Sequence, residues 1–152
     1  MNRARIIILL CFVFSVAFGR EVKIAYFDSG RIREEWDEWK DAQAKFDQDV
    51  AKWQEEAQKM EEEITSLMEE YQKQELLLSE DKRQEKQMII QQKQQEYQEY
   101  LASIFGETGK AAQRNAELTA PLYEKLNKAL AKFADREGYT IIFDAAASSI
   151  AY

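Results

Sequence analysis

A heptad repeat of apolar residues constrains the fold of this chain more than any other feature. Apolar side chains recur from Trp36 to Tyr71 at alternating spacings of three and four residues, with Gln43 as the one polar exception. The series consists of Trp36, Trp39, Phe46, Val50, Trp53, Ala57, Met60, Ile64, Leu67 and Tyr71. The intervening residues are mostly Glu, Asp, Lys and Gln. This pattern is typical of a helix that packs lengthwise against another helix.

The length of this helix predicts an arm that projects from the rest of the molecule. A helix from about Arg33 to Leu76 would be roughly 65 Å long, at about 1.5 Å per residue. A compact domain of 152 residues cannot enclose such a length. A serine and two acids at 79–81 then mark the start of a second helix. We therefore predict a mostly α fold, in which residues 33–133 form one antiparallel helical hairpin with its turn near 77–80.

A turn centred on Leu78 also predicts which residues face each other, because the numbers in each pair should add to about 156, twice 78. The predicted pairs are Leu67 with Ile89, Met60 with Tyr97, Trp53 with Ile104, Phe46 with Ala111, Trp39 with Leu118, and Trp36 with Leu122. Gly106 and Gly109 interrupt the returning helix, either to make room for rings or to form a flexible point. Pro121 is expected to bend the helix near Glu117.

Short β-branched and aromatic runs flank the predicted hairpin. Residues 22–27 predict a strand, and either Asp28 or Ser29 caps the helix that follows it. Gly138 signals the end of the returning helix, and residues 139–144 form a continuous apolar run typical of a strand buried on both faces. Residues 150–152 could add a last short strand. So small a sheet is not stable alone, which predicts a body that several subunits build from residues 20–32 and 134–152.

The N-terminal segment has the layout of a secretory signal peptide. Arg3 and Arg5 precede the apolar run at 6–14, and small residues at 17–19 suit cleavage after Gly19. Because both arginines and the single cysteine leave with this segment, the net charge of −7 becomes about −9 and no disulfide can form. We therefore expect an exported protein whose stability comes from packing or assembly.

The composition excludes several classes of function. The chain has no histidine and, after cleavage, no cysteine, so histidine-based triads and thiol chemistry are excluded. No glycine-rich phosphate loop occurs. We predict no enzyme, no cofactor and no metal site. An acidic chain of this kind also lacks the clustered lysine and arginine that nucleic-acid binding requires.

Five stretches resemble the Skp (OmpH) family of periplasmic chaperones. They are Lys23–Asp28, the turn Leu78–Asp81, the glutamine-rich Gln91–Tyr97, Pro121–Lys132 and Gly138–Asp144. The resemblance implies a periplasmic homotrimer, in which strands from three subunits form a small β-barrel body and three helical hairpins project from it around a cavity. The strand residues expected to join the subunits are Val22, Ile24, Tyr26, Ile141, Ile142 and Phe143.

The same resemblance implies that the protein binds unfolded outer-membrane proteins without ATP, and such binding needs exposed apolar surface. Two apolar triplets near the turn offer it, because a seam covers only one or two of three consecutive helix residues. The candidate client-binding residues are Leu67, Met68, Tyr71, Leu76, Leu77, Leu78, Met88, Ile89 and Ile90. The alternative is that these residues only hold the tip of the hairpin together.

Charge separates this chain from the well-known family members, which are strongly basic. Residues 61–93 contain nine acids and five bases. Binding of lipopolysaccharide or of a membrane surface is therefore left open. The leading hypothesis is an ATP-independent periplasmic chaperone that holds unfolded envelope proteins. The rival hypothesis is a structural coiled-coil scaffold of the cell envelope, whose apolar seam pairs with helices of a partner.

Overall fold

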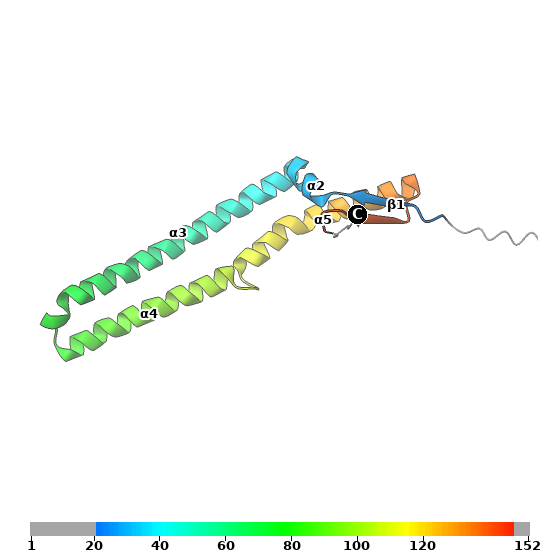
Figure 1. Cartoon of the computed structure of the whole chain (residues 1–152). Coiled ribbons are helices and arrows are strands. Elements are labelled where there is room, and N and C mark those ends of the chain that lie inside the picture. The colour runs from blue at the N-terminus through cyan, green and yellow to red at the C-terminus, as the bar shows by residue number, and fades with distance from the viewer. Residues whose placement is uncertain (1–20, 148–152) are drawn as a thin grey trace, which may run out of the picture.

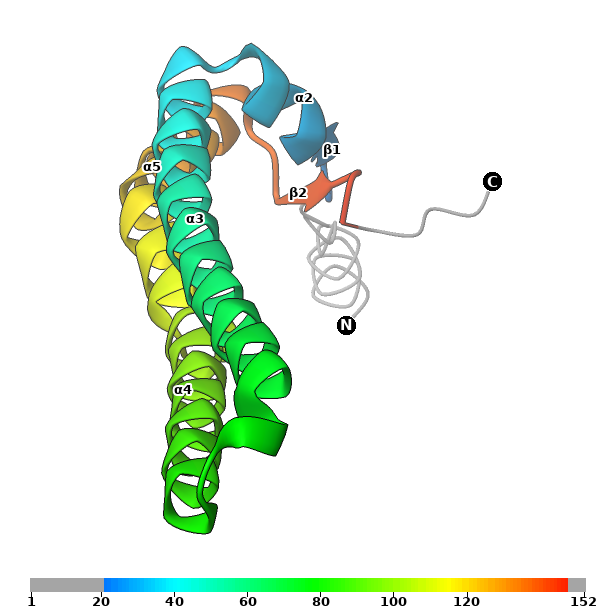
Figure 2. The same ribbon diagram turned by 90° about the vertical axis from the view of Figure 1, so that its left-hand side faces the viewer.

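The computed structural model describes residues 21–147, so the predicted signal peptide and the predicted strand at 150–152 lie outside it. Its elements are β1 (Ile24–Phe27), α2 (Ser29–Glu35), α3 (Asp37–Gln74), the 3-10 helix η1 (Glu75–Leu77), α4 (Glu80–Phe105), α5 (Lys110–Glu137) and β2 (Ile141–Asp144). The fold is mostly helical with a small two-stranded sheet, as predicted. Figures 1 and 2 show α3 alongside α4 and α5 as one long arm, with the sheet at the end opposite the turn. None of the helices described is long and apolar enough to cross a membrane.

The first helix of the arm is broken at Trp36, which the sequence did not predict. Asp28 caps α2, since its Oδ1 accepts hydrogen bonds from the backbone N–H groups of Gly30 (2.9 Å) and Arg31 (3.1 Å). Trp36 is extended (φ −86°, ψ 111°), and α3 starts directly after it. The single helix predicted from Arg33 is therefore two helices.

The arm turns through a tightened helical end. The α-helix becomes a 3-10 helix at residues 75–77, Leu78 is extended, and Ser79 stands at the N-cap position of α4. The Ser79 side chain makes no capping hydrogen bond, so the favourable charge at this helix start comes from Glu80 and Asp81 in the first turn.

Between the turn and the middle of the arm, the facing residues follow the predicted register. Lys86 Nζ lies 2.8 Å from Glu70 Oε1, and the two residue numbers add to 156. The sum is also 156 for Lys93 Nζ and Glu63 Oε1, which are 3.0 Å apart. A third pair, Tyr100 and Glu56, gives the same value. The predicted pairing is therefore confirmed for α3 against α4.

Nearer the base, the predicted register is wrong. Arg114 Nε lies 2.8 Å from Asp49 Oδ2, and those residue numbers add to 163. Lys125 pairs with Glu38 at the same sum. The pairs predicted for this region add to 157 or 158, so these contacts displace α5 along α3 by five or six residues, about one and a half helical turns. The sequence predicted here the pairs Phe46 with Ala111, Trp39 with Leu118, and Trp36 with Leu122. The shift changes these pairings, although Trp36, Trp39, Leu118 and Leu122 still lie in one apolar cluster.

A four-residue loop between α4 and α5 causes the shift. The chain leaves the arm at Gly106 and returns at Gly109, whose N–H donates to the Gly106 carbonyl (2.9 Å); the loop stands out from the arm in Figure 1. A Cβ on Gly109 would lie 2.5 Å from the carbonyl oxygen of Ile104, and one on Gly106 would lie 2.4 Å from that of Ala102. The two glycines therefore allow close backbone contact, a role that neither of the predicted alternatives described.

This contact predicts that Gly109→Ala destabilises the arm by about 1–3 kcal/mol, because the added methyl group must displace backbone rather than a movable side chain. Urea unfolding followed by circular dichroism measures the loss. The control is Glu107→Ala in the same loop, where the side chain is exposed and the expected change is within about 0.5 kcal/mol. Equal losses in the two variants would contradict this account of the loop.

The base of the arm holds a small apolar core. It contains the buried residues Trp39, Ala42 and Leu122, with Trp36 and Leu118 packed against it. The Trp39 ring meets that of Tyr123 edge to face at 5.1 Å. α5 remains helical through Pro121.

The sheet joins the two ends of the described chain. β1 and β2 pair in parallel, in a register that places Ile24 beside Ile141 and Phe27 beside Asp144. Gly138 ends α5 in the left-handed conformation (φ 72°), which confirms the predicted cap. Both strands are shorter than predicted and alternate between exposed and half-buried residues. One face of the sheet is therefore open in the single chain, although the apolar run at 139–144 predicted burial on both faces.

Candidate functional site

The tip of the arm exposes large apolar side chains. Leu76 and Leu77 are 95 % and 87 % exposed, and Met88 is 63 % exposed. The cause is local: the 3-10 helix departs from the heptad phase of α3, so both leucines point away from the seam. Met68 and Ile89 are exposed to about two-fifths.

The other candidates from the sequence lie in the contact between the helices. Leu67, Tyr71, Leu78 and Ile90 are half-buried. The Tyr71 hydroxyl donates a hydrogen bond to Glu75 Oε1 (3.2 Å), four residues along the chain. It accepts one from Gln87 Nε2 (2.7 Å) on α4, across the hairpin. The nine candidates therefore fall into two sets, with four that pack within the hairpin and five that remain open to solvent.

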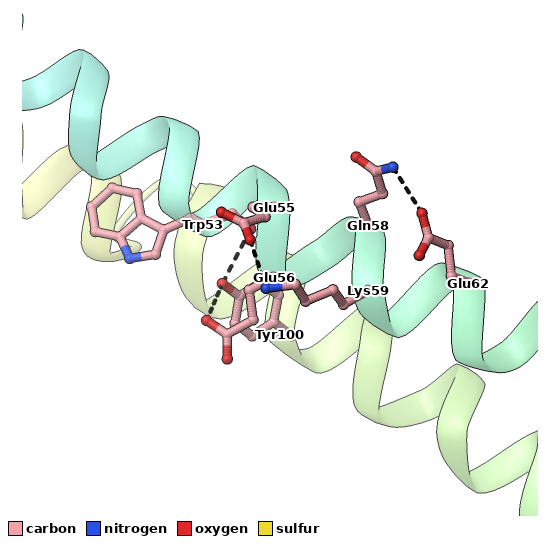
Figure 3. Close-up of polar contacts among 7 residues, drawn as sticks. All are labelled: Trp53, Glu55, Glu56, Gln58, Lys59, Glu62 and Tyr100. Carbon is pink, nitrogen blue, oxygen red and sulfur yellow. Dashed lines mark hydrogen bonds and ion pairs between the residues drawn. The ribbon is translucent and has the colours of Figure 1, made fainter.

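One side of the arm is closed by a row of polar contacts between the helices. The α3 members are Glu56, Glu63 and Glu70, seven residues apart, and the α4 members are Tyr100, Lys93 and Lys86. Figure 3 shows the Tyr100 end of this row. The Tyr100 hydroxyl lies 3.0 Å from Glu56 Oε2 and 3.2 Å from the Trp53 carbonyl oxygen. The pKa of Tyr100 is raised to about 12, mainly because the hydroxyl is buried and secondly because it bonds Glu56.

The opposite side of the arm is hollowed. A groove of about 900 Å³ runs between α3 and α4 over a floor that includes Ala57, Tyr97, Leu101 and Phe105. Its α3 edge carries three carboxylates, those of Glu61, Glu62 and Glu69. Figure 3 shows that Glu62, held by Gln58 Nε2 at 2.8 Å, points away from Tyr100 and the closed side.

A second hollow of about 370 Å³ continues toward the tip, between Met68 and Tyr71 on α3 and Ile90 on α4. Neither hollow was predicted, because the heptad pattern identifies the seam but not the side of it that stays open. The closed side did have a signal: glutamates at 56, 63 and 70 share one heptad position, and so do Lys86, Lys93 and Tyr100.

The sheet presents the second apolar surface. Val22, Ile24, Tyr26, Ile141 and Phe143 are all exposed, with Val22 and Tyr26 at 60 %. The Tyr26 and Phe143 rings stack at 5.7 Å. Ile142 is half-buried and lies on the other face of the strand. Five of the six predicted joining residues thus share one open surface, and the sixth packs toward its own chain.

The acidic side chains beside the sheet serve the backbone. Asp144 Oδ1 accepts hydrogen bonds from the N–H groups of Ser29 (3.2 Å) and Ala146 (3.0 Å). Hydrogen bonding to the Ser29 side chain is the largest reason that the pKa of Asp144 lies below its ordinary value, and the backbone N–H groups of Ser29 and Ala146 lower it further. Within residues 21–147, no group of three or more His, Cys, Asp and Glu side chains is arranged to hold a metal ion.

Comparison with known proteins agrees with this architecture. None of the curated proteins matches the sequence. The model of one protein family, described as outer membrane protein (OmpH-like), matches residues 23–152, which include both strands and the entire arm. The family resemblance noted in the strand and turn motifs is thereby confirmed. The chain belongs to the OmpH-like family.

Proposed function

We propose that the protein is an ATP-independent holdase of the periplasm, which binds unfolded outer-membrane or other envelope proteins and keeps them from aggregating. The observation that carries the proposal is the exposed apolar tip, with Leu76 and Leu77 almost fully in water. Membership of the OmpH-like family supports the same class of function. A structural scaffold would gain nothing from leucines that its own packing leaves exposed.

The physical basis is apolar surface presented on a charged arm. α3 has 38 residues and is therefore about 57 Å long, so the tip lies far from the base. Exposed methionines such as Met68 and Met88 adapt to varied apolar partners because their side chains are unbranched and flexible. The many charged residues along the arm keep it soluble while the tip is open. Binding of this kind needs no nucleotide.

The open face of the sheet supports assembly as a further part of the proposal. A two-stranded sheet with Val22, Ile24, Tyr26, Ile141 and Phe143 exposed is not stable alone in water. Strands from other copies would cover this surface and build a shared β-barrel body. We propose a homotrimer with three arms that surround a client.

The function is tested with an outer-membrane β-barrel protein diluted from urea, whose aggregation is followed by light scattering. We expect suppression at one trimer per client, without ATP, and a trimer in sedimentation. An equal mass of a helical protein without an exposed apolar tip is the control. Unchanged aggregation at a several-fold excess would contradict the holdase and favour the scaffold.

A further inference from the structure

We propose that the open side of the arm is a binding groove for peptide segments that combine apolar residues with lysine or arginine. The groove is defined by the two hollows between α3 and α4. The inference rests on the proposed function, because the segments would belong to unfolded clients, but it assigns a second site and a charge preference that the apolar tip does not imply.

The first argument is that the two sides of the arm differ. On the closed side, Glu63 and Glu70 are neutralised by lysines of α4, and Glu56 is bonded to Tyr100. These contacts join the two helices along this edge.

On the open side, no lysine or arginine lines either hollow. Across the second hollow the helices meet through neutral contacts, since Gln87 bonds the Tyr71 hydroxyl and Gln94 lies 3.9 Å from Met68 Sδ. Among the described residues, no hydrogen bond or ion pair joins the two helices across the first hollow.

The second argument is that the two hollows form one track. The residues that line it include 54, 61 and 68 on α3 with 75 at the start of η1, and 87, 94 and 101 on α4. Each series advances by seven, so each keeps to one side of its helix. From Gln54 to Glu75 the track is about 30 Å long. This length accommodates roughly nine residues of an extended peptide.

The third argument is the charge of the groove. Its floor includes the rings of Tyr97 and Phe105, and Phe105 is 43 % exposed. Among the described residues, Glu61 and Glu62 make no ion pair, and Glu69 has only Lys73 of its own helix at 3.7 Å. An apolar floor beside carboxylates without cationic partners across the groove complements a segment that carries apolar and basic side chains.

Charge also argues against a second copy of the arm as the occupant. The groove edge is acidic, and the whole chain carries a net charge of −7. Two such edges repel each other, whereas a basic segment is attracted. For the same reason, we expect the groove to bind basic segments and not acidic ones.

The test uses the purified protein and two fluorescent twelve-residue peptides of leucine with either lysine or glutamate in the same order. We expect the lysine peptide to bind at least tenfold more tightly, with an affinity that falls as salt rises. The triple variant E61Q/E62Q/E69Q should bind it about tenfold more weakly, since each exposed ion pair contributes a factor of about two. The control E99Q/E107Q/E124Q removes the same charge from exposed positions outside the groove and should bind normally.

Cross-linking places the peptide. A photoreactive benzoylphenylalanine in place of Ser66, within the groove, should capture the lysine peptide, whereas the same group in place of Gln92, outside it, should not. Equal affinity for the two peptides, full binding by the triple variant, or a chain-to-chain adduct at Ser66 would each overturn the proposal.

Aggregation assays with the same triple variant separate this proposal from the proposed function. If the intact protein suppresses aggregation but shows no preference for the lysine peptide, the groove proposal fails and the holdase stands. If the lysine peptide binds in the groove but no unfolded client is kept soluble, the holdase fails.

Discussion

Removing the exposed apolar side chains of the tip should raise the protein concentration needed to suppress client aggregation at least tenfold. The variant is L76S/L77S/M88S. A tenfold change corresponds to about 1.4 kcal/mol, which is less than the roughly 1.5–3 kcal/mol gained when one such side chain is buried. A tenfold loss is therefore the least that we expect when three such side chains are removed, even if a client covers each of them only in part. Light scattering of an unfolded β-barrel protein measures it.

The tip variant should also leave the arm folded, because its three residues are mostly exposed and pack little within the chain. Circular dichroism melting curves should agree with those of the parent to within a few degrees. The matched control Q84S/Q92S/Q98S places the same number of serines at exposed polar positions outside the groove and should suppress aggregation normally. Undiminished suppression by the tip variant would remove the tip from the client surface.

The largest loss of stability is expected from Trp39→Ala, at about 3–5 kcal/mol. Trp39 is 7 % exposed and lies between the Trp36 ring, at 6.1 Å, and the Tyr123 ring, at 5.1 Å. So few residues are buried at the base that nothing nearby can fill the cavity. Urea unfolding at a fixed protein concentration measures the change, because the proposed assembly would make stability depend on concentration.

Two further variants calibrate this result. Tyr123→Ala removes the other half of the edge-to-face contact from a half-exposed position and should cost clearly less than Trp39→Ala. Trp39→Phe keeps an aromatic ring and should recover part of the loss. A cost below about 1 kcal/mol for Trp39→Ala would show that the small core does not hold the base together.

The hairpin could be predicted from the sequence because its signals are local. The heptads identify the helices, and the serine with two acids at 79–81 identifies the turn. The register near the base could not be predicted, because more than one register places apolar residues of α5 against Trp39. Leu118 was predicted to face Trp39, but the ring that it meets is that of Tyr123, five residues farther along. Only the loop from Gly106 to Gly109 decides between the two registers, and its path depends on close backbone contacts.

Of the two proposed binding surfaces, the tip could be predicted from the sequence and the groove could not. The exposed leucines of the tip followed from three consecutive apolar residues, which no helical seam can cover. The groove did not follow, because it depends on which side of the seam the helices bridge. The break at Trp36 was also missed, since this residue fits the heptad phase. Asp37 and Glu38 in the first turn of α3 were the available sign of a new helix start.

The parallel pairing of the terminal strands has a consequence for how the chain folds. Contacts across the arm join residues that are 16 apart near the turn, then 44, 65 and 87 apart toward the base. The sheet joins Lys23 to Thr140, 117 residues away. Because the entropy cost of closing a loop grows with its length, we expect the arm to zip from tip to base, with the sheet closing last. A newly made chain would then have a complete tip before it has the sheet surface through which we propose that copies assemble.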